Sequence, residues 1–195
     1  TLEALESVAF TDKEMLRADQ ELHPPFGSYL ACRPDRVNRL HRTSGTTGQA
    51  MNLAVSHDDG LIHAAVAARG QRAAGLAPGD RVIHCLNYQM WMGGLTDHLG
   101  LEVTGATVIP FGIGNTELLV RTIRDLAVTA ISCTPSYVAT IERVIEDKFP
   151  ALSPRDLGLR IALMGGEAGL DSPDFRARIE NVWGMKAMNS NYGVG

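Results

Sequence analysis

A short loop without bulky side chains has the clearest chemical use in this sequence. From Thr43 to Gly48 the chain reads "TSGTTG", so every residue is Ser, Thr or Gly. A bare backbone lets successive N–H groups point at one anion, and the Ser and Thr hydroxyls add further donors. The loop therefore indicates a site for a phosphate chain, although such a cluster is also common in a tight hairpin turn.

The loop differs from the best-known phosphate motif. A Walker A loop needs two glycines five positions apart and a lysine after the second. Here Gly45 and Gly48 are closer together, and Gln49 stands where the lysine would be. The loop alone thus leaves both interpretations open, an anion site and a plain turn.

Motifs for other chemistries are incomplete. The six histidines form no HxxxH or HExxH pattern, which favours hydrogen-bonded structural residues over metal ligands. Cys133 has hydroxyl neighbours but no triad partner at a recognisable spacing, so we do not assign it as a nucleophile. The segment "FGIGNTE" lacks the third glycine of a dinucleotide-binding turn. We assign no catalytic residue and no metal ligand.

The overall composition points to small-molecule partners. The formal net charge is −4, and lysine and arginine are scattered, so no basic stripe is available for nucleic acid or anionic lipid. No apolar run approaches the roughly 20 residues that span a bilayer. The three cysteines are isolated, which is typical of free thiols in a reducing compartment. We expect a cytoplasmic protein.

A regular series of strands and helices is predicted after Pro78. Short apolar runs, partly β-branched, are typical of buried parallel strands, and they cover residues 80–86, 106–111, 128–133, 159–164 and 185–189. Helical patterns lie between them. The sequence thus predicts an α/β fold with an open, twisted, mostly parallel sheet and flanking helices, whose ligands bind at the carboxyl ends of the strands.

Two of the helices carry local signals. Asn115 or Thr116 is suited to cap one of them, because its side-chain oxygen can accept from a free backbone N–H. Another is predicted between residues 136 and 149, where Tyr137, Ile141, Val144 and Ile145 form one apolar stripe.

The beginning of the chain has a different pattern. Residues 11–22 are predicted to form a short capped helix, and residues 23–36 an extended connector rich in proline. We expect residues 1–40 to be a segment that packs on the main domain and residues 41–195 to be an incomplete α/β nucleotide-binding domain.

Six motifs, in this order, resemble those of the adenylate-forming acyl ligases, and closely those of the phenylacetate–coenzyme A ligase branch. They are "PFG", "SGTTG", "GNTE", "CTPSY", "GGE" and "YG", and together they cover nearly the whole chain. The resemblance implies part of the large N-terminal domain of such an enzyme. Family members join a carboxylic acid to AMP from ATP, release pyrophosphate, and pass the acyl group to a thiol, usually that of coenzyme A.

The resemblance assigns roles to individual residues. The loop that wraps the β- and γ-phosphates is Ser44, Gly45, Thr46, Thr47 and Gly48. The adenine and ribose contacts fall on Gly165, Gly166, Glu167, Ser190, Asn191, Tyr192 and Gly193. The acyl pocket falls on Leu86, Tyr88, Trp91 and Gly94.

Simpler interpretations exist for some of these positions. The glycine pair at 165 and 166 also suits a strand-to-helix turn, and Tyr192 could be a core aromatic residue. The aromatic residues near position 90 could equally belong to the core. The branch is richer in glycine there, so Asn87, Gln89 and Met90 leave the acid open and are compatible with a polar ring substituent.

The sequence departs from the family in two ways. Gln49 and Ala50 replace the usual Lys-Pro, which removes a positive charge beside the loop. The chain also stops at Gly195, before the glutamate that helps hold Mg²⁺ and before the lid with its catalytic lysine. We therefore expect a fragment that folds at least in part but does not adenylate an acid by itself.

The expected cofactors are ATP, Mg²⁺ and coenzyme A, and the expected partners are a carboxylic acid and, in a homodimer, a second copy of the chain. Two alternatives to the ligase stay open. One is an adenylyl or acyl transferase of the same fold with a hydroxyl or amine acceptor. The other is a non-catalytic nucleotide-binding domain. The acid and the acceptor are not readable from the residues.

Overall fold

The computed structural model describes residues 2–43, 45 and 50–190. The chain divides into two compact units, residues 1–59 and residues 60–194. The first unit contains α1 (Leu2–Glu6), α2 (Lys13–Leu22), the 3-10 helix η1 (Pro34–Arg36), β1 (Val37–Arg42) and β2 (Asn52–Ser56). Helix α3 (His57–Ala73) starts at the end of the first unit and continues into the second.

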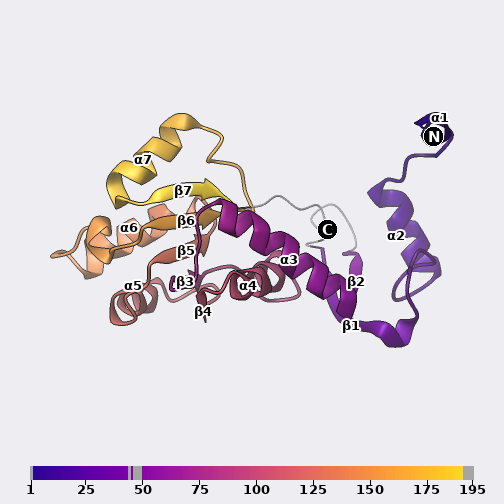
Figure 1. The fold of residues 1–195 in the computed structure, drawn as a ribbon, viewed down its shortest axis with the longest axis horizontal. Helices are drawn as coiled ribbons and strands as arrows, with labels where there is room; N and C mark the ends of the chain where they lie inside the picture. Colours follow the sequence, from indigo (N-terminus) through magenta and orange to yellow (C-terminus); the bar gives the residue numbers. More distant parts are fainter. Residues whose placement is uncertain (1, 44, 46–49, 191–195) are drawn as a thin grey trace. The chain divides into compact units, whose positions relative to one another are not determined.

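The second unit is an alternation of strands and helices. Its elements are β3 (Arg81–His84), α4 (Met92–Val103), β4 (Thr107–Pro110), α5 (Thr116–Asp125), β5 (Ala130–Cys133), α6 (Tyr137–Lys148), the 3-10 helix η2 (Pro154–Leu157), β6 (Ile161–Met164), α7 (Pro173–Trp183) and β7 (Lys186–Asn189). The strands form one five-stranded sheet in the order β4-β3-β5-β6-β7 (Figure 1). Every neighbouring pair is parallel, which confirms the predicted α/β fold and all five predicted strands.

Alternate residues of the strands face two separate apolar cores. On β5 and β6, Ile131 and Ala162 belong to the core that contains residues of α5, α6 and α7. Their neighbours Ala130 and Ile161 belong to the second core, which contains Leu101 of α4. Because side chains alternate across a strand, a sheet covered on both faces needs continuous apolar runs, as this sequence has.

The local helix signals are confirmed. The Asn115 side chain accepts from the Leu118 N–H at 3.1 Å and so caps α5. The predicted stripe on α6 faces the core through Ile141 and Ile145, which are fully buried. Val144 is only partly buried, and Val138 takes its place in the core.

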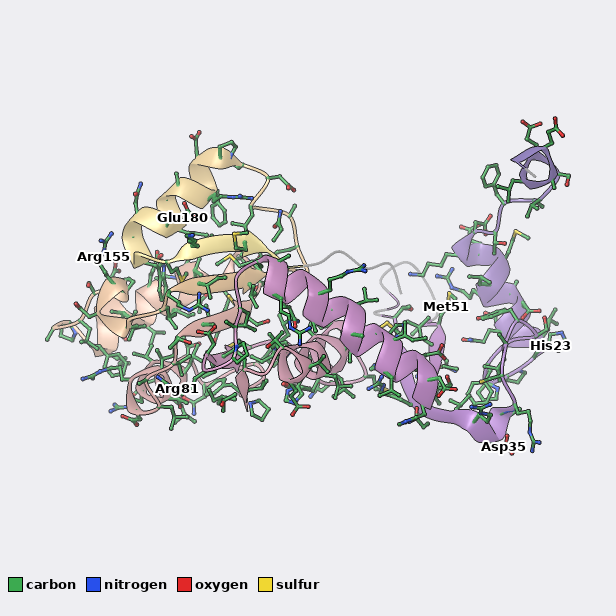
Figure 2. The ribbon with its side chains drawn as sticks, viewed as in Figure 1. His23, Asp35, Met51, Arg81, Arg155 and Glu180 are labelled. Atoms are coloured by element: carbon green, nitrogen blue, oxygen red, sulfur yellow. The ribbon has the colours of Figure 1, made fainter. Side chains whose placement is uncertain are left out.

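Side chains outside the core fix the ends of the elements. Arg81, the first residue of β3, donates to the Leu126 carbonyl at 2.8 Å and so holds the turn before β5 (Figure 2). Arg155 of η2 donates to the Asn181 carbonyl at 2.5 Å. On α7, the Glu180 carboxylate accepts from the Ala187 N–H at 3.1 Å and ties this helix to β7.

A buried carboxylate joins the amino-terminal ends of three strands. Asp80 precedes β3 and is 6% exposed. One of its oxygens accepts from the Thr129 hydroxyl, just before β5, at 2.7 Å, and from Arg160 Nε, just before β6, at 2.8 Å. The second oxygen accepts from the Ala77 N–H. Burial alone would raise the pKa of Asp80, but these hydrogen bonds outweigh it and hold the pKa below its ordinary value.

The first unit contains a β-hairpin whose two strands the sequence did not predict, although a hairpin turn was one of the two interpretations left open for the loop. Strands β1 and β2 pair antiparallel, with Arg42 opposite Asn52. Gln20 of α2 is buried, accepts from the Asn52 N–H at 2.7 Å and donates to the Asn52 carbonyl at 3.0 Å. Helix α2 is thereby attached to β2.

The predicted helix at residues 11–22 is confirmed, with Asp12 as its N-cap. The expected extended connector over residues 23–36 is wrong for residues 23–29, which form turns and a bend, and for Pro34–Arg36, which form the 3-10 helix η1. Both Asp19 oxygens accept from Ser28 at 2.6 Å, which folds this segment back on α2. The expected division into residues 1–40 and 41–195 stays a prediction, because it concerns how the parts pack together. Among the described helices, none combines the length and the apolar character needed to cross a bilayer.

We predict that Asp80→Asn lowers the free energy of unfolding by about 2 kcal/mol, because it removes the charge that pairs with Arg160, whose own side chain is partly exposed. Urea denaturation at pH 7 measures this. Asp125→Asn, at an exposed position on α5, is the control. A loss no larger than that of the control would contradict the prediction.

Candidate functional site

The carboxyl ends of three neighbouring strands are joined by backbone hydrogen bonds. The Gly165 N–H, after β6, donates to the Cys133 carbonyl at the end of β5 at 3.2 Å. The Ser190 N–H, after β7, donates to the Met164 carbonyl at 2.8 Å. The predicted adenine and ribose residues Gly165 and Ser190 are therefore placed on adjacent strand ends, at the edge of an open parallel sheet where ligands usually bind.

The turn after β6 needs its glycine. Gly166 has φ +85°, a conformation that side chains with a Cβ rarely adopt. Glu167 follows, and its carboxylate accepts from the Ser136 N–H at 2.5 Å, at the residue that precedes α6. The Glu167 side chain therefore holds this turn against α6, and the backbone of the turn carries the predicted nucleotide contacts.

The four predicted acyl-pocket residues lie on the segment after β3 and at the start of α4. Leu86 and Gly94 are buried, and Tyr88 and Trp91 are partly buried. A Cβ built on Gly166 would lie 3.3 Å from the Trp91 ring, so the indole packs beside the turn after β6. The structure thus brings Trp91 of the predicted acyl pocket together with Gly166 of the predicted nucleotide site.

Gly94 permits a close backbone approach. A Cβ at this position would lie 2.0 Å from the Asn87 carbonyl oxygen and 3.2 Å from the Tyr88 Cα. No side chain fits there without displacement of the backbone. The first turn of α4 therefore packs directly on the segment that carries Tyr88.

The side chain of His84, the last residue of β3, is fully buried. Its Nδ1 lies 2.9 Å from Ser132 Oγ on β5, and its Nε2 lies 2.8 Å from the Gly94 carbonyl oxygen. Burial, with a smaller contribution from nearby His98, lowers the pKa of His84 to about 4, against the opposing effect of the hydrogen bond to the Gly94 carbonyl. The ring is neutral at pH 7.

A second polar chain lies beside this histidine. The Tyr88 hydroxyl is 2.9 Å from His98 Nδ1, and His98 Nε2 is 3.3 Å from a Glu102 oxygen. The rings of His84, Tyr88 and His98 pack edge to face, with centroids 5.5 to 6.2 Å apart. Burial, aided by Cys85 and Glu102, raises the pKa of Tyr88 to about 12. The interpretation of the histidines as hydrogen-bonded structural residues is confirmed for His84 and His98.

The base of the predicted phosphate loop is well defined. The Thr43 N–H donates to the Met51 carbonyl at 3.0 Å, and Thr43 Oγ1 accepts from the Met51 N–H at 3.0 Å. Gly45 has φ +67°, which suits glycine. A cavity of about 290 Å³ adjoins this end of the hairpin, and Arg17 and Arg42 are among its lining residues.

Several predicted site residues lie outside the described part of the chain. From the phosphate loop these are Ser44, Thr46, Thr47 and Gly48, and from the nucleotide site Asn191, Tyr192 and Gly193. Their assignments stay predictions. The loop also belongs to the first compact unit, whereas the strand ends belong to the second.

Two other features bear on the chemistry. Cys133 is fully buried, and burial, with a contribution from Glu167, raises its pKa to about 12, so its thiol is protonated at pH 7 and a poor nucleophile. Within residues 2–43, 45 and 50–190, no group of three His, Cys, Asp or Glu side chains is placed to hold a metal ion.

Sequence reasoning missed the pairing of His84 with Ser132 and Gly94. Ser132 directly faces His84 across the paired strands β3 and β5. A polar residue in each of two adjacent buried strands is the signal that could have found this pair, since buried polar groups need partners.

We predict that Gly94→Ala lowers the free energy of unfolding by about 3 kcal/mol, because the new methyl group forces the backbone apart from Asn87. Gly70→Ala is the matched control, as Gly70 lies in α3 and its Cβ would make only an ordinary 3.5 Å contact. The control should be neutral or slightly stabilising. Denaturant midpoints of both variants measure the difference, and equal midpoints would contradict it.

We also predict that stability falls as the pH drops from about 6.5 toward 4. His84 has its ordinary pKa of 6.5 when unfolded and about 4 when folded, so the unfolded chain binds the extra proton first. The neutral ring's full contribution is present above 6.5, and the loss amounts to about 3 kcal/mol across this interval. Denaturation of the wild type and of His84→Gln over this range measures it, and parallel pH curves would count against it.

Comparison with known proteins shows the family. The family described as AMP-binding enzyme matches residues 4–194. The phenylacetate–coenzyme A ligases of Thermus thermophilus and Pseudomonas putida are 36% and 38% identical to this chain over 193 residues, which is 99% of it. The chain spans 41% and 42% of the length of these relatives.

Solved structures agree. A 2-hydroxyisobutyryl-CoA ligase in an open conformation, in complex with 2-HIB-AMP and CoA, matches with a TM-score of 0.88 and 30% identity, over 96% of this chain and 40% of that one. The same ligase in the thioesterification state matches with a TM-score of 0.88 and 32% identity, again over 96% of this chain and 40% of that one. The resemblance to the phenylacetate–coenzyme A ligases is therefore confirmed, and the chain belongs to the AMP-binding enzyme family.

Proposed function

We propose that these residues are part of an AMP-forming ligase, which activates an aryl or arylacetic acid as its acyl-adenylate and transfers the acyl group to coenzyme A. One observation carries the proposal. Trp91 of the predicted acyl pocket packs beside Gly166, in the turn that carries the predicted adenosine contacts. An acid and a nucleotide held by these residues would be neighbours, as attack of a carboxylate on the α-phosphate requires.

In this proposal the two ligand sites use different chemistry. The backbone of Gly165 and Gly166, with Ser190, Asn191, Tyr192 and Gly193, binds adenine and ribose. The acid lies against Leu86, Tyr88, Trp91 and Gly94, where an apolar surface with a few polar groups suits a flat ring.

The pyrophosphate leaving group would be held by the loop of Ser44, Gly45, Thr46, Thr47 and Gly48. Donors placed for the departing charge lower the barrier to adenylyl transfer. We propose that Mg²⁺ binds mainly through the ATP phosphates, as this ion commonly does. The cytoplasmic location and the homodimer stay predictions.

The names of the relatives and the ligands of the solved neighbour support this proposal over the alternatives. The relatives named above are phenylacetate–coenzyme A ligases, and the solved neighbour binds an acyl-adenylate and CoA. A transferase with a hydroxyl or amine acceptor, or a non-catalytic nucleotide-binding domain, would be favoured only by a different outcome of the following test.

The test is a panel of benzoates, phenylacetates and hydroxylated aryl acids, assayed with the full-length protein for AMP release with and without coenzyme A. We expect AMP to accumulate over many turnovers only when both an aryl acid and coenzyme A are present. Full release without the thiol would favour the transferase. No AMP and no ATP–pyrophosphate exchange with any acid would favour the non-catalytic domain.

A further inference from the structure

The hydrogen bonds of His84 define its tautomer. A carbonyl oxygen only accepts, so the 2.8 Å contact with the Gly94 carbonyl places a proton on Nε2. In the neutral ring Nδ1 is then the acceptor, and the Ser132 hydroxyl donates to it at 2.9 Å. Both ring nitrogens and the hydroxyl proton are satisfied, which a buried polar group requires.

The same ring connects the strand ends to the segment after β3. One contact reaches the backbone of Gly94, in the first turn of α4. A second is the edge-to-face packing on Tyr88, with centroids 5.5 Å apart. Gly94 is itself packed against the backbone of Asn87. His84 thus holds both sides of this turn, the side with Tyr88 and the side with Gly94.

The turn between these two sides has some order of its own. The Asn87 side chain accepts from the Gln89 N–H at 2.9 Å. Met90 has φ +55° and is exposed. Trp91, next along the chain, packs beside Gly166. A shift of the Gly94 end would therefore move the Trp91 ring relative to the turn after β6.

We propose that His84 is a positioning residue for the acid: through its Nε2–H bond to the Gly94 carbonyl it sets where Tyr88 and Trp91 stand, and so determines the affinity for the acid substrate. This inference rests on the proposed function, because it takes residues 86–94 as the acyl pocket. Other groups that face the ring are His98 of α4 and Tyr88, with Glu102 beyond His98.

Two near-isosteric variants separate the two bonds of the ring. The amide of His84→Gln reaches the place of Nε2 and retains a donor for the Gly94 carbonyl. The shorter amide of His84→Asn reaches only the place of Nδ1, so it retains a contact with Ser132 and leaves the Gly94 carbonyl without this donor. His57→Asn, at an exposed position, is the matched control.

The first readout is kinetic and uses the full-length protein with phenylacetate, or with the panel acid of highest kcat/KM if phenylacetate is not turned over. We expect His84→Asn to raise the KM for the acid about tenfold and to leave the KM for ATP within about twofold. His84→Gln should stay within about threefold of the wild type for both substrates.

The second readout does not depend on turnover. Hydrogen exchange of the amides of residues 87–98 should be faster in His84→Asn than in His84→Gln, because only His84→Asn loosens the start of α4. Exchange in His57→Asn should equal that of the unaltered protein.

The possible results lead to different conclusions. If the two His84 variants have equal acid KM values, or if ATP and acid KM values rise together, His84 is a core residue and the inference is overturned. Equal hydrogen exchange in the two variants overturns it as well. If the unaltered protein turns over no acid, the proposed function fails, and the role in acid binding fails with it, whatever the exchange shows about the bond.

Discussion

The structure depends most on the alignment of its parallel strands, and one carboxylate fixes this at their amino-terminal ends. Asp80 accepts hydrogen bonds from Thr129 and Arg160, so the starts of β3, β5 and β6 are tied to one point. The strands are short, with four residues each. A slip of one residue in a strand would move each of its side chains to the opposite face of the sheet. The tie therefore protects both cores and also the alignment of the carboxyl ends.

The carboxyl ends of the same strands carry a second set of polar groups. His84 and Ser132 face each other across β3 and β5, and the turn after β6 contains Gly166 and Glu167. Their hydrogen bonds hold the segments that leave the sheet, so backbone groups and aromatic rings gather at one edge. The two ends of the sheet thus differ in role. The buried Asp80 carboxylate maintains the register at one end, and the turns with the predicted ligand contacts project from the other.

Much of the fold could be predicted from the sequence. The five strands are mostly apolar runs, and the start of α5 is predicted by Asn115, whose side chain is well suited to cap a helix. A hairpin turn at the loop was left open, but the strand β1 could not be predicted, because it reads "VNRLHR" and carries arginine and asparagine on its exposed face. The contact of His84 with Gly94 was hidden, since it forms only when the sheet and α4 assemble, whereas Ser132 could have been found from its place in a buried strand. The close approach of Gly94 to Asn87 leaves no mark in the sequence beyond a glycine inside a helix.

That close approach of Gly94 to Asn87 has a consequence for any redesign of the proposed acid pocket. Because the backbones at positions 87 and 94 touch, the segment between them is clamped at its base and exposed at its tip, where Gln89 and Met90 lie. Libraries that randomise Gln89 and Met90 would sample new side chains on an unchanged backbone, whereas substitutions of Gly94 would destabilise that backbone.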